Sequence, residues 1–192
     1  MLKEIETFRP ASRKEWRRWL EKHHETKQSI WLIQSKKEFN LPTLSWSEAV
    51  EEALCFGWID STRKTLDKET FIQFFCKRKP KSVWSKINKD KVQQLIEKGL
   101  MTKAGYASIE IARQNGSWDI LNDVEELKIP EDLEKEFQRK PGSGDFFLSL
   151  SKSAKKSILQ WLILAKRPET RQKRVAEIAE LAAQKLKPKQ FR

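Results

Sequence analysis

The chain has 192 residues and carries 39 lysines and arginines against 27 aspartates and glutamates, which gives a formal net charge of +12. Eight tryptophans and ten phenylalanines supply large side chains for a core, which excludes global disorder. Two cysteines are too few for a disulfide framework, and no apolar run reaches the roughly 20 residues of a membrane span, so we expect a cytoplasmic protein.

The first predicted elements are a helix and a strand. Ser12 and Glu15 have the spacing of a capping box, and apolar residues then recur at helical spacing, which predicts a helix over residues 13–24. The run SIWLIQSKK, residues 29–37, is short, apolar and rich in β-branched and aromatic residues. It therefore predicts a buried strand.

A second helix and a hairpin follow. Ser45 and Glu48 repeat the capping-box pattern, and Gly57 stands where a glycine would end the helix in a left-handed conformation. Residues 58–79 then predict a β-hairpin with its turn at residues 66–69. The stretch EALCFGWIDSTRKT is thus first of all a corner between a helix and a strand.

This corner also holds chemically reactive side chains. Cys55 falls in the last helical turn among core positions, which favours a buried structural thiol over a nucleophile, because no histidine lies near it in sequence. Asp60 is followed by Arg63 and Lys64, which favours a charged pair at the end of a sheet, with catalysis as the alternative.

Beyond Pro80 the patterns are helical. Asn88 is the predicted N-cap of a helix that stops at Gly99, and Thr102 caps a helix that ends at residue 115. Further helices are predicted after Pro130, over residues 153–166 with Trp161 on the apolar face, and over residues 168–186 with Pro168 at the first position. Residues 117–130 and the run KPGSGD, residues 140–145, predict loops, and the tail KPKQFR is expected to fray.

These elements predict an α+β fold, in which a small antiparallel sheet with packed helices is followed by a C-terminal helical module. We expect a core domain over residues 1–118 and the helical module over residues 119–192, with one continuous globular unit as the alternative.

The inventory for catalysis is thin. The sequence has no H-E-x-x-H, no paired C-x-x-C, no Walker A loop and no dinucleotide glycine fingerprint. Its two histidines, His23 and His24, are adjacent, so on a helix they point about 100° apart and cannot easily share a metal. We therefore predict no metal site, no cofactor and no catalytic residue, and favour a protein that is not an enzyme.

Positive charge is concentrated in two segments. Residues 63–103 carry 12 basic and 4 acidic side chains, and residues 151–192 carry 12 and 3, whereas residues 104–150 between them carry 5 and 10. This distribution favours an anionic partner, which could be a small ligand, a nucleic acid or an acidic protein surface. The alternative is that lysine-rich helices simply face water.

Each segment supplies candidate anion-binding residues. Around Trp84 a helix start with several cations could hold a phosphate or carboxylate, and the tryptophan could stack on a base or fill a gap between hairpin and helix. The second cluster, from Lys166 to Arg174, could bind an anion or could equally tie the terminal helices to the acidic segment, residues 104–150. The candidate residues are Arg78, Lys79, Lys81, Ser85, Asn88, Lys166, Arg167, Arg171 and Arg174.

Three stretches, SWSEAVEEALCFGWIDS, KRKPKSVWSKINKDKVQQLIEKGLMTKAGYASIEIARQNGSW and WLILAKRPETRQKRVAEI, resemble the YdeI/OmpD-associated, or bacteriocin-protection, family from about residue 28 to 180. The resemblance implies an α+β core with a closing helical module, and a bacterial cytoplasmic protein linked to envelope stress or resistance to cationic peptides. It supplies no catalytic residues.

The leading hypothesis is a stress-associated protein whose basic surface binds an anionic partner. One alternative is a nucleic-acid-binding module. Another is an enzyme of unknown reaction, with a pocket formed by Trp58, Asp60, Arg63 and Trp84 at the end of the sheet. No transmembrane segment and no particular oligomeric state are predicted.

Overall fold

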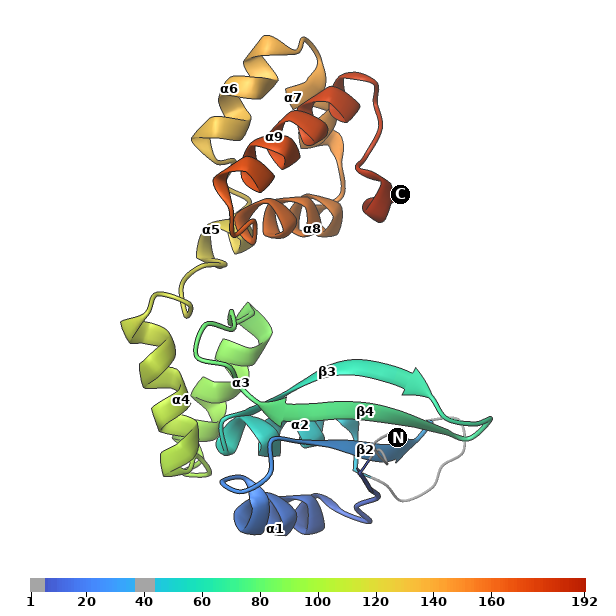
Figure 1. Cartoon of the computed structure of the whole chain (residues 1–192), viewed down its shortest axis with the longest axis vertical. Helices are drawn as coiled ribbons and strands as arrows, with labels where there is room; N and C mark the ends of the chain where they lie inside the picture. Colours follow the sequence, from blue (N-terminus) through green and yellow to red (C-terminus); the bar gives the residue numbers. More distant parts are fainter. Residues whose placement is uncertain (1–5, 37–43) are drawn as a thin grey trace. The chain divides into compact units, whose positions relative to one another are not determined.

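A computed structural model describes residues 6–36 and 44–192 of the chain. Lys37, the last residue of the strand predicted over 29–37, and residues 1–5 lie outside the described residues. The chain divides into two compact units, residues 1–118 and 119–192. A sheet with helices forms the first unit and helices form the second, so the predicted α+β class is confirmed (Figure 1).

The N-terminal unit is built on a four-stranded sheet with the strand order β1-β2-β4-β3. β2 and β4 pair antiparallel, as do β3 and β4, but β1 runs parallel to β2. The sheet is therefore mixed, whereas the sequence predicted an antiparallel sheet. The helix α1 between β1 and β2 provides the crossover that parallel neighbours require. The strands are β1 Thr7–Phe8, β2 Ser29–Ser35, β3 Trp58–Thr65 and β4 Thr70–Lys77.

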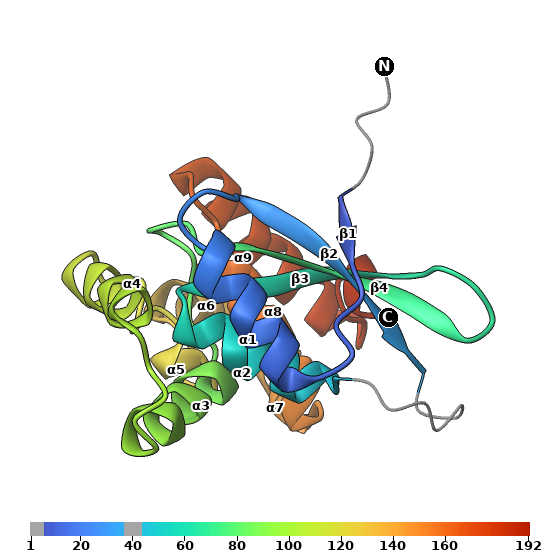
Figure 2. The ribbon, with the colours of Figure 1, turned by 90° about the horizontal axis from the view of Figure 1, so that it is seen from below.

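Helices α1 and α2 lie over one face of this sheet (Figure 2). Trp16 on α1 is fully buried, packs edge-on against Phe75 of β4, and donates from its indole nitrogen to the carbonyl oxygen of Ala49 at 3.0 Å. A single tryptophan thus connects both helices to the sheet. The helices in the described part of this unit are α1 Arg13–His23, α2 Trp46–Cys55, α3 Lys86–Glu97 and α4 Lys103–Gln114.

Helix caps agree with the predicted chemistry except at α3. Ser45 and Glu48 form a complete capping box, and Gly57 has the expected positive φ of 71°. Ser85, not Asn88, caps α3, because the Ser85 hydroxyl accepts from the backbone N–H of Asn88. The helix therefore begins about one turn earlier than predicted.

The C-terminal unit consists of helices around a small apolar core. Leu133, Phe147, Leu159 and Ile178 come from four different helices and are all buried. Pro168 occupies the first turn of its helix, as predicted. The helices are α5 Asn122–Glu125, α6 Glu131–Arg139, α7 Ser143–Ser149, α8 Lys152–Ile163 and α9 Pro168–Ala183, followed by the 3₁₀ turn η2 Lys189–Phe191.

Four predictions for this unit are corrected. The loop predicted over residues 117–130 contains the short helix α5. The loop predicted over residues 140–145 ends at Gly142, where a positive φ of 77° leads directly into α7. The tail does not fray, because η2 places Phe191 edge-on against Trp161. Trp161 itself is only partly buried, since the buried stripe of α8 runs through Ile158, Leu159 and Leu162. Among the described residues, no helix combines the length and apolar character needed to cross a membrane.

Candidate anion-binding site

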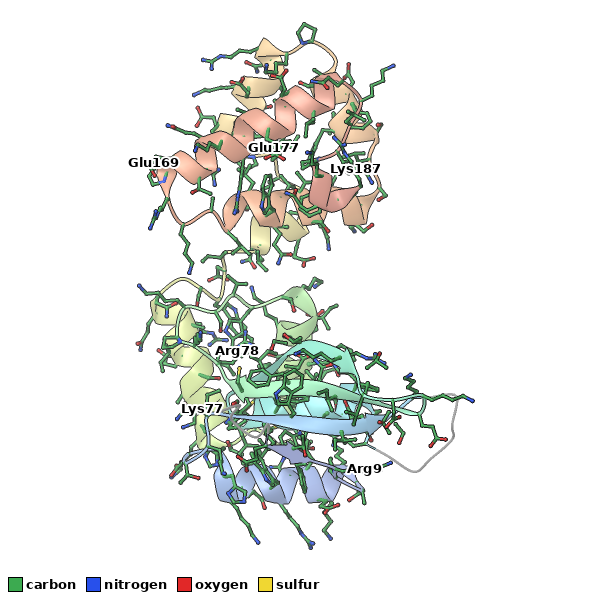
Figure 3. The ribbon with its side chains drawn as sticks, turned by 45° about the vertical axis from the view of Figure 1, so that its right-hand side comes forward. Arg9, Lys77, Arg78, Glu169, Glu177 and Lys187 are labelled. Carbon is green, nitrogen blue, oxygen red and sulfur yellow. The ribbon has the colours of Figure 1, made fainter. Side chains whose placement is uncertain are left out.

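The N-terminal unit contains a cavity of about 500 Å³ at the end of β4. One wall is cationic and is formed by the consecutive residues Lys77, Arg78 and Lys79. Figure 3 shows Lys77 and Arg78 at this end of the strand, next to α4. The rest of the lining includes the polar residues His24, Glu25 and Ser108, but it is largely apolar. The apolar part comes from Phe56, Gly57, Pro80, Trp84, Ala104, Ala107 and Ile111.

Arg78 is the unusual residue of this wall. Its guanidinium carbon lies 3.6 Å from the centre of the Trp84 ring, and Nη2 donates to the carbonyl oxygen of Val83 at 2.8 Å. The other two nitrogens, Nε and Nη1, are buried and donate to no atom of the described residues. Burial lowers the pKa of Arg78 to about 10, although the nearby Asp60 carboxylate and Cys76 act in the opposite direction.

Helix α4 forms the opposite wall of the cavity, and two glycines allow its backbone to approach the neighbouring segment closely. The backbone of Gly57 approaches α4 so closely that a Cβ there would lie 2.9 Å from the carbonyl oxygen of Ala104. On α4, a Cβ at Gly105 would lie only 2.4 Å from the carbonyl oxygen of Cys55. The Thr102 hydroxyl, which caps α4, also donates to that Cys55 oxygen at 2.6 Å. This contact fixes the distance from α4 to the end of the sheet.

The first predicted cluster is divided by the fold. Arg78 and Lys79 line the cavity, and Lys81 is exposed nearby. Ser85 uses its hydroxyl as the cap of α3, where it accepts from the backbone N–H of Asn88, so this hydroxyl already has a partner. Trp84 is 1% exposed and packs against Trp118. It fills a gap in the fold and offers no free face on which a base could stack.

The second cluster lies in the C-terminal unit and is partly neutralised there. Arg171 donates from Nε and Nη2 to the two carboxylate oxygens of Asp132 at 2.6 and 2.9 Å. This hydrogen bonding and the charge of Arg171 lower the pKa of Asp132. Arg174 donates to the Trp161 carbonyl oxygen, whereas Lys166 and Arg167 are exposed. Glu169 and Glu177 add negative charge along α9 (Figure 3). Arg171 therefore ties α9 to the acidic segment.

The residues of the enzyme alternative do not share one cavity. Trp58 is fully buried, and Trp84 lines the cavity beside Arg78. Asp60 and Arg63 border a second, more open hollow of about 350 Å³. There the Asp60 carboxylate accepts from the Trp46 indole and the Gln73 amide, at 2.9 and 3.1 Å.

Cys55 has the environment of a structural thiol. It is fully buried, and burial raises its pKa to about 11, so the thiolate that a nucleophile requires is disfavoured. In residues 6–36 and 44–192, no group of three histidine, cysteine, aspartate or glutamate side chains is placed to hold a metal ion.

Comparison with protein families gives two matches, one within each of the two compact units. Residues 8–108, more than half of the chain, match the family described as Domain of unknown function (DUF8412). The chain belongs to this family. Residues 126–185 match the family described as Bacteriocin-protection, YdeI or OmpD-Associated, which confirms the resemblance for this part of the chain. No curated protein and no solved structure matches the chain.

The lining residues of the cavity lie in the part of the chain that matches DUF8412, apart from Ile111 on α4. The candidate cations from Lys166 to Arg174 lie in the part that matches the bacteriocin-protection family. Of the three stretches that carry the resemblance, the first therefore falls in the DUF8412 match, while the third falls in the bacteriocin-protection match.

Several lining residues were not predicted. His24, Glu25, Phe56 and the α4 residues Ala104, Ala107 and Ser108 reach the cavity only because distant segments meet there. The run KAGYAS, with small residues at successive turns, was a signal for close approach of α4 to another backbone. Which segment α4 approaches could not be predicted from the neighbouring sequence, because Cys55 and Gly57 lie about 50 residues away.

Proposed function

We propose that this protein is a cytoplasmic binding protein, not an enzyme, that takes up a small organic anion in the cavity of its N-terminal unit. The observation that carries the proposal is the burial of Arg78 with two nitrogens lacking partners. A guanidinium without its hydration is costly, and an anion in the adjoining cavity offsets that cost through its opposite charge. An exposed arginine would gain much less from the same ligand.

The other lining residues narrow the ligand class. A volume of about 500 Å³ falls within the range of about 300–1,000 Å³ that is usual for small-molecule pockets. Phe56, Trp84, Ala107 and Ile111 favour an apolar body, while Lys77 and Lys79 favour a carboxylate, sulfonate or phosphate at one end. The ligand we expect is therefore an amphipathic organic anion with a compact, mainly apolar body.

The cellular role we propose is indirect protection under stress. The match over residues 126–185 is to a family whose name refers to bacteriocin protection. A chain with a net charge of +12 repels a cationic peptide, so direct sequestration is disfavoured. If the N-terminal unit binds an anionic ligand, protection would instead depend on the concentration of that ligand in the cell. Cys55 and Cys76 are both free thiols, which is compatible with a reducing cytoplasm.

The test uses 8-anilinonaphthalene-1-sulfonate, an aromatic sulfonate whose fluorescence rises in apolar sites. We expect wild-type protein to bind it saturably, and Arg78→Met to raise the Kd about 10- to 100-fold, because hydrogen bonds to a charged group contribute roughly 1.5–3 kcal/mol. Lys81→Met is the matched control, since it removes the same charge from an exposed position three residues away. Its Kd should change less than about twofold.

Stability separates loss of the site from loss of the fold. In Arg78→Met, relief of a buried charge offsets the lost stacking on Trp84 and the lost bond to Val83, so the free energy of unfolding should change by less than about 1 kcal/mol. Near-UV circular dichroism should be unchanged. Equal binding by wild type and Arg78→Met, or no saturable binding by wild type, would contradict the proposal.

A further inference from the structure

The sheet of the N-terminal unit has one covered and one open face. Along β2, Ile30, Leu32 and Gln34 are buried beneath the helices, while the residues between them are only partly buried. This alternation is the pattern of a strand with one covered face. Among the described residues of this unit, no helix lies over the opposite face (Figures 1 and 2).

Strand register identifies what this open face presents. Trp31 of β2 and Phe74 of β4 are direct cross-strand partners, so both side chains point to the same side of the two central strands. Their ring centres are 5.0 Å apart. On β3, the Lys64 ammonium nitrogen lies 5.2 Å from the centre of the Trp31 ring. The open face is defined here by Trp31, Ile33, Ile59, Lys64 and Phe74, with the buried side chain of Ile72 on the same side.

We infer that the open face binds single-stranded nucleic acid, with Trp31 and Phe74 as stacking surfaces for bases and Lys64 as a contact to phosphate. Paired aromatic rings on the central strands of a four-stranded sheet, with helices behind, suit unstacked bases. This inference rests on the sheet and is independent of the cavity beside Arg78.

Charge favours a nucleic acid over a protein partner. Across the described strands, the positions that share this side of the sheet carry no carboxylate, since Asp60 points to the side covered by the helices with its register partner Phe75. The hairpin adds exposed cations at Lys64 and Lys68, whereas Arg63 is the register partner of Gln73 and points to the covered side. A phosphate backbone that crosses β3 would meet these cations while its bases lie over Trp31 and Phe74.

The inference is tested with fluorescently labelled 12-mers of mixed sequence, as single-stranded RNA, single-stranded DNA and duplex DNA, in fluorescence anisotropy titrations of the full chain. We expect binding to single strands at 50 mM salt that weakens at 200 mM. Combining Trp31→Ala with Phe74→Ala should weaken it at least about tenfold, because each stacked base contributes about 1–3 kcal/mol. Trp46→Ala is the matched control, since Trp46 is 46% exposed but lies on α2.

Two further variants keep the result interpretable. Lys64→Gln leaves the aromatic packing intact and should reduce both the affinity and its salt dependence. Arg78→Met should bind oligonucleotides like wild type, which separates this site from the proposed cavity site. Absence of binding at 50 mM salt, or equal binding by the Trp31/Phe74 double variant, would overturn the inference. So would a dimer in sedimentation that the double variant abolishes without any oligonucleotide binding.

Discussion

Replacing Glu52 with glutamine is expected to lower the free energy of unfolding of the N-terminal unit by about 3 kcal/mol, because it neutralises a buried carboxylate that two partly buried arginines share. Glu52 is 3% exposed and accepts from Arg13 Nε at 2.6 Å and from Arg17 Nη1 at 2.8 Å. Arg17 also donates to the carbonyl oxygen of Leu100 at 3.1 Å. One carboxylate thus joins α1 and α2 to the loop before α4.

Denaturant unfolding with Glu21→Gln as the control measures this effect. Glu21 is 52% exposed and also pairs with Arg17, at 3.5 Å, so the control removes the same charge from the same arginine. Its substitution should cost less than about 0.5 kcal/mol, as is usual for an exposed pair on one helix. If Glu52→Gln and Glu21→Gln had the same effect, the buried network would not stabilise the unit as described.

Replacing Gly105 with alanine is expected to destabilise the N-terminal unit by about 3 kcal/mol, the upper part of the range for overpacking. Glycine to alanine within a helix ordinarily stabilises by about 0.5–1 kcal/mol, so the expected sign is reversed. The reason is contact with backbone, since the new Cβ would lie 2.4 Å from the Cys55 carbonyl oxygen and 2.9 Å from its carbon. Neither atom can move away by a change of rotamer.

Gly144 in α7 provides the control for this sign reversal. A Cβ there would lie 3.7 Å from the nearest atom, the Phe137 Cβ, which is ordinary van der Waals contact. Gly144→Ala should therefore stabilise the C-terminal unit by about 0.5–1 kcal/mol. Thermal unfolding of both variants tests the pair. A stabilising Gly105→Ala would show that α4 does not approach α2 as closely as the structure places it.

Local chemistry predicted most of the fold. The capping box at Ser45, the glycine stop at Gly57 and Pro168 at the start of α9 each depend on neighbours within a few residues, and each is confirmed. The failures involve contacts between distant residues. β1 is only two residues long and exists through its pairing with β2, and the tail is ordered because Phe191 reaches Trp161.

The candidate site was only partly visible in the sequence. The sequence identified Arg78 only as one of several candidate cations. Its burial over Trp84 could not be predicted, because it depends on how the hairpin, α3 and α4 meet. The net charge also overstates the number of cations that are available to bind a partner. Lys91 pairs with Glu51 at 2.8 Å and Arg171 pairs with Asp132, so part of each basic cluster serves the fold. Charge counts alone cannot distinguish an arginine that has found a partner from one that has not.

The most direct test of the central claim is a crystal structure of the full chain grown with 4-bromobenzoate, a small aromatic carboxylate whose bromine is located by anomalous scattering. We expect a bromine peak inside the cavity, beside Phe56 and the α4 wall, with the carboxylate within hydrogen-bonding distance of Arg78. Bromine peaks found only outside the cavity, with Arg78 still lacking an anionic partner, would contradict it.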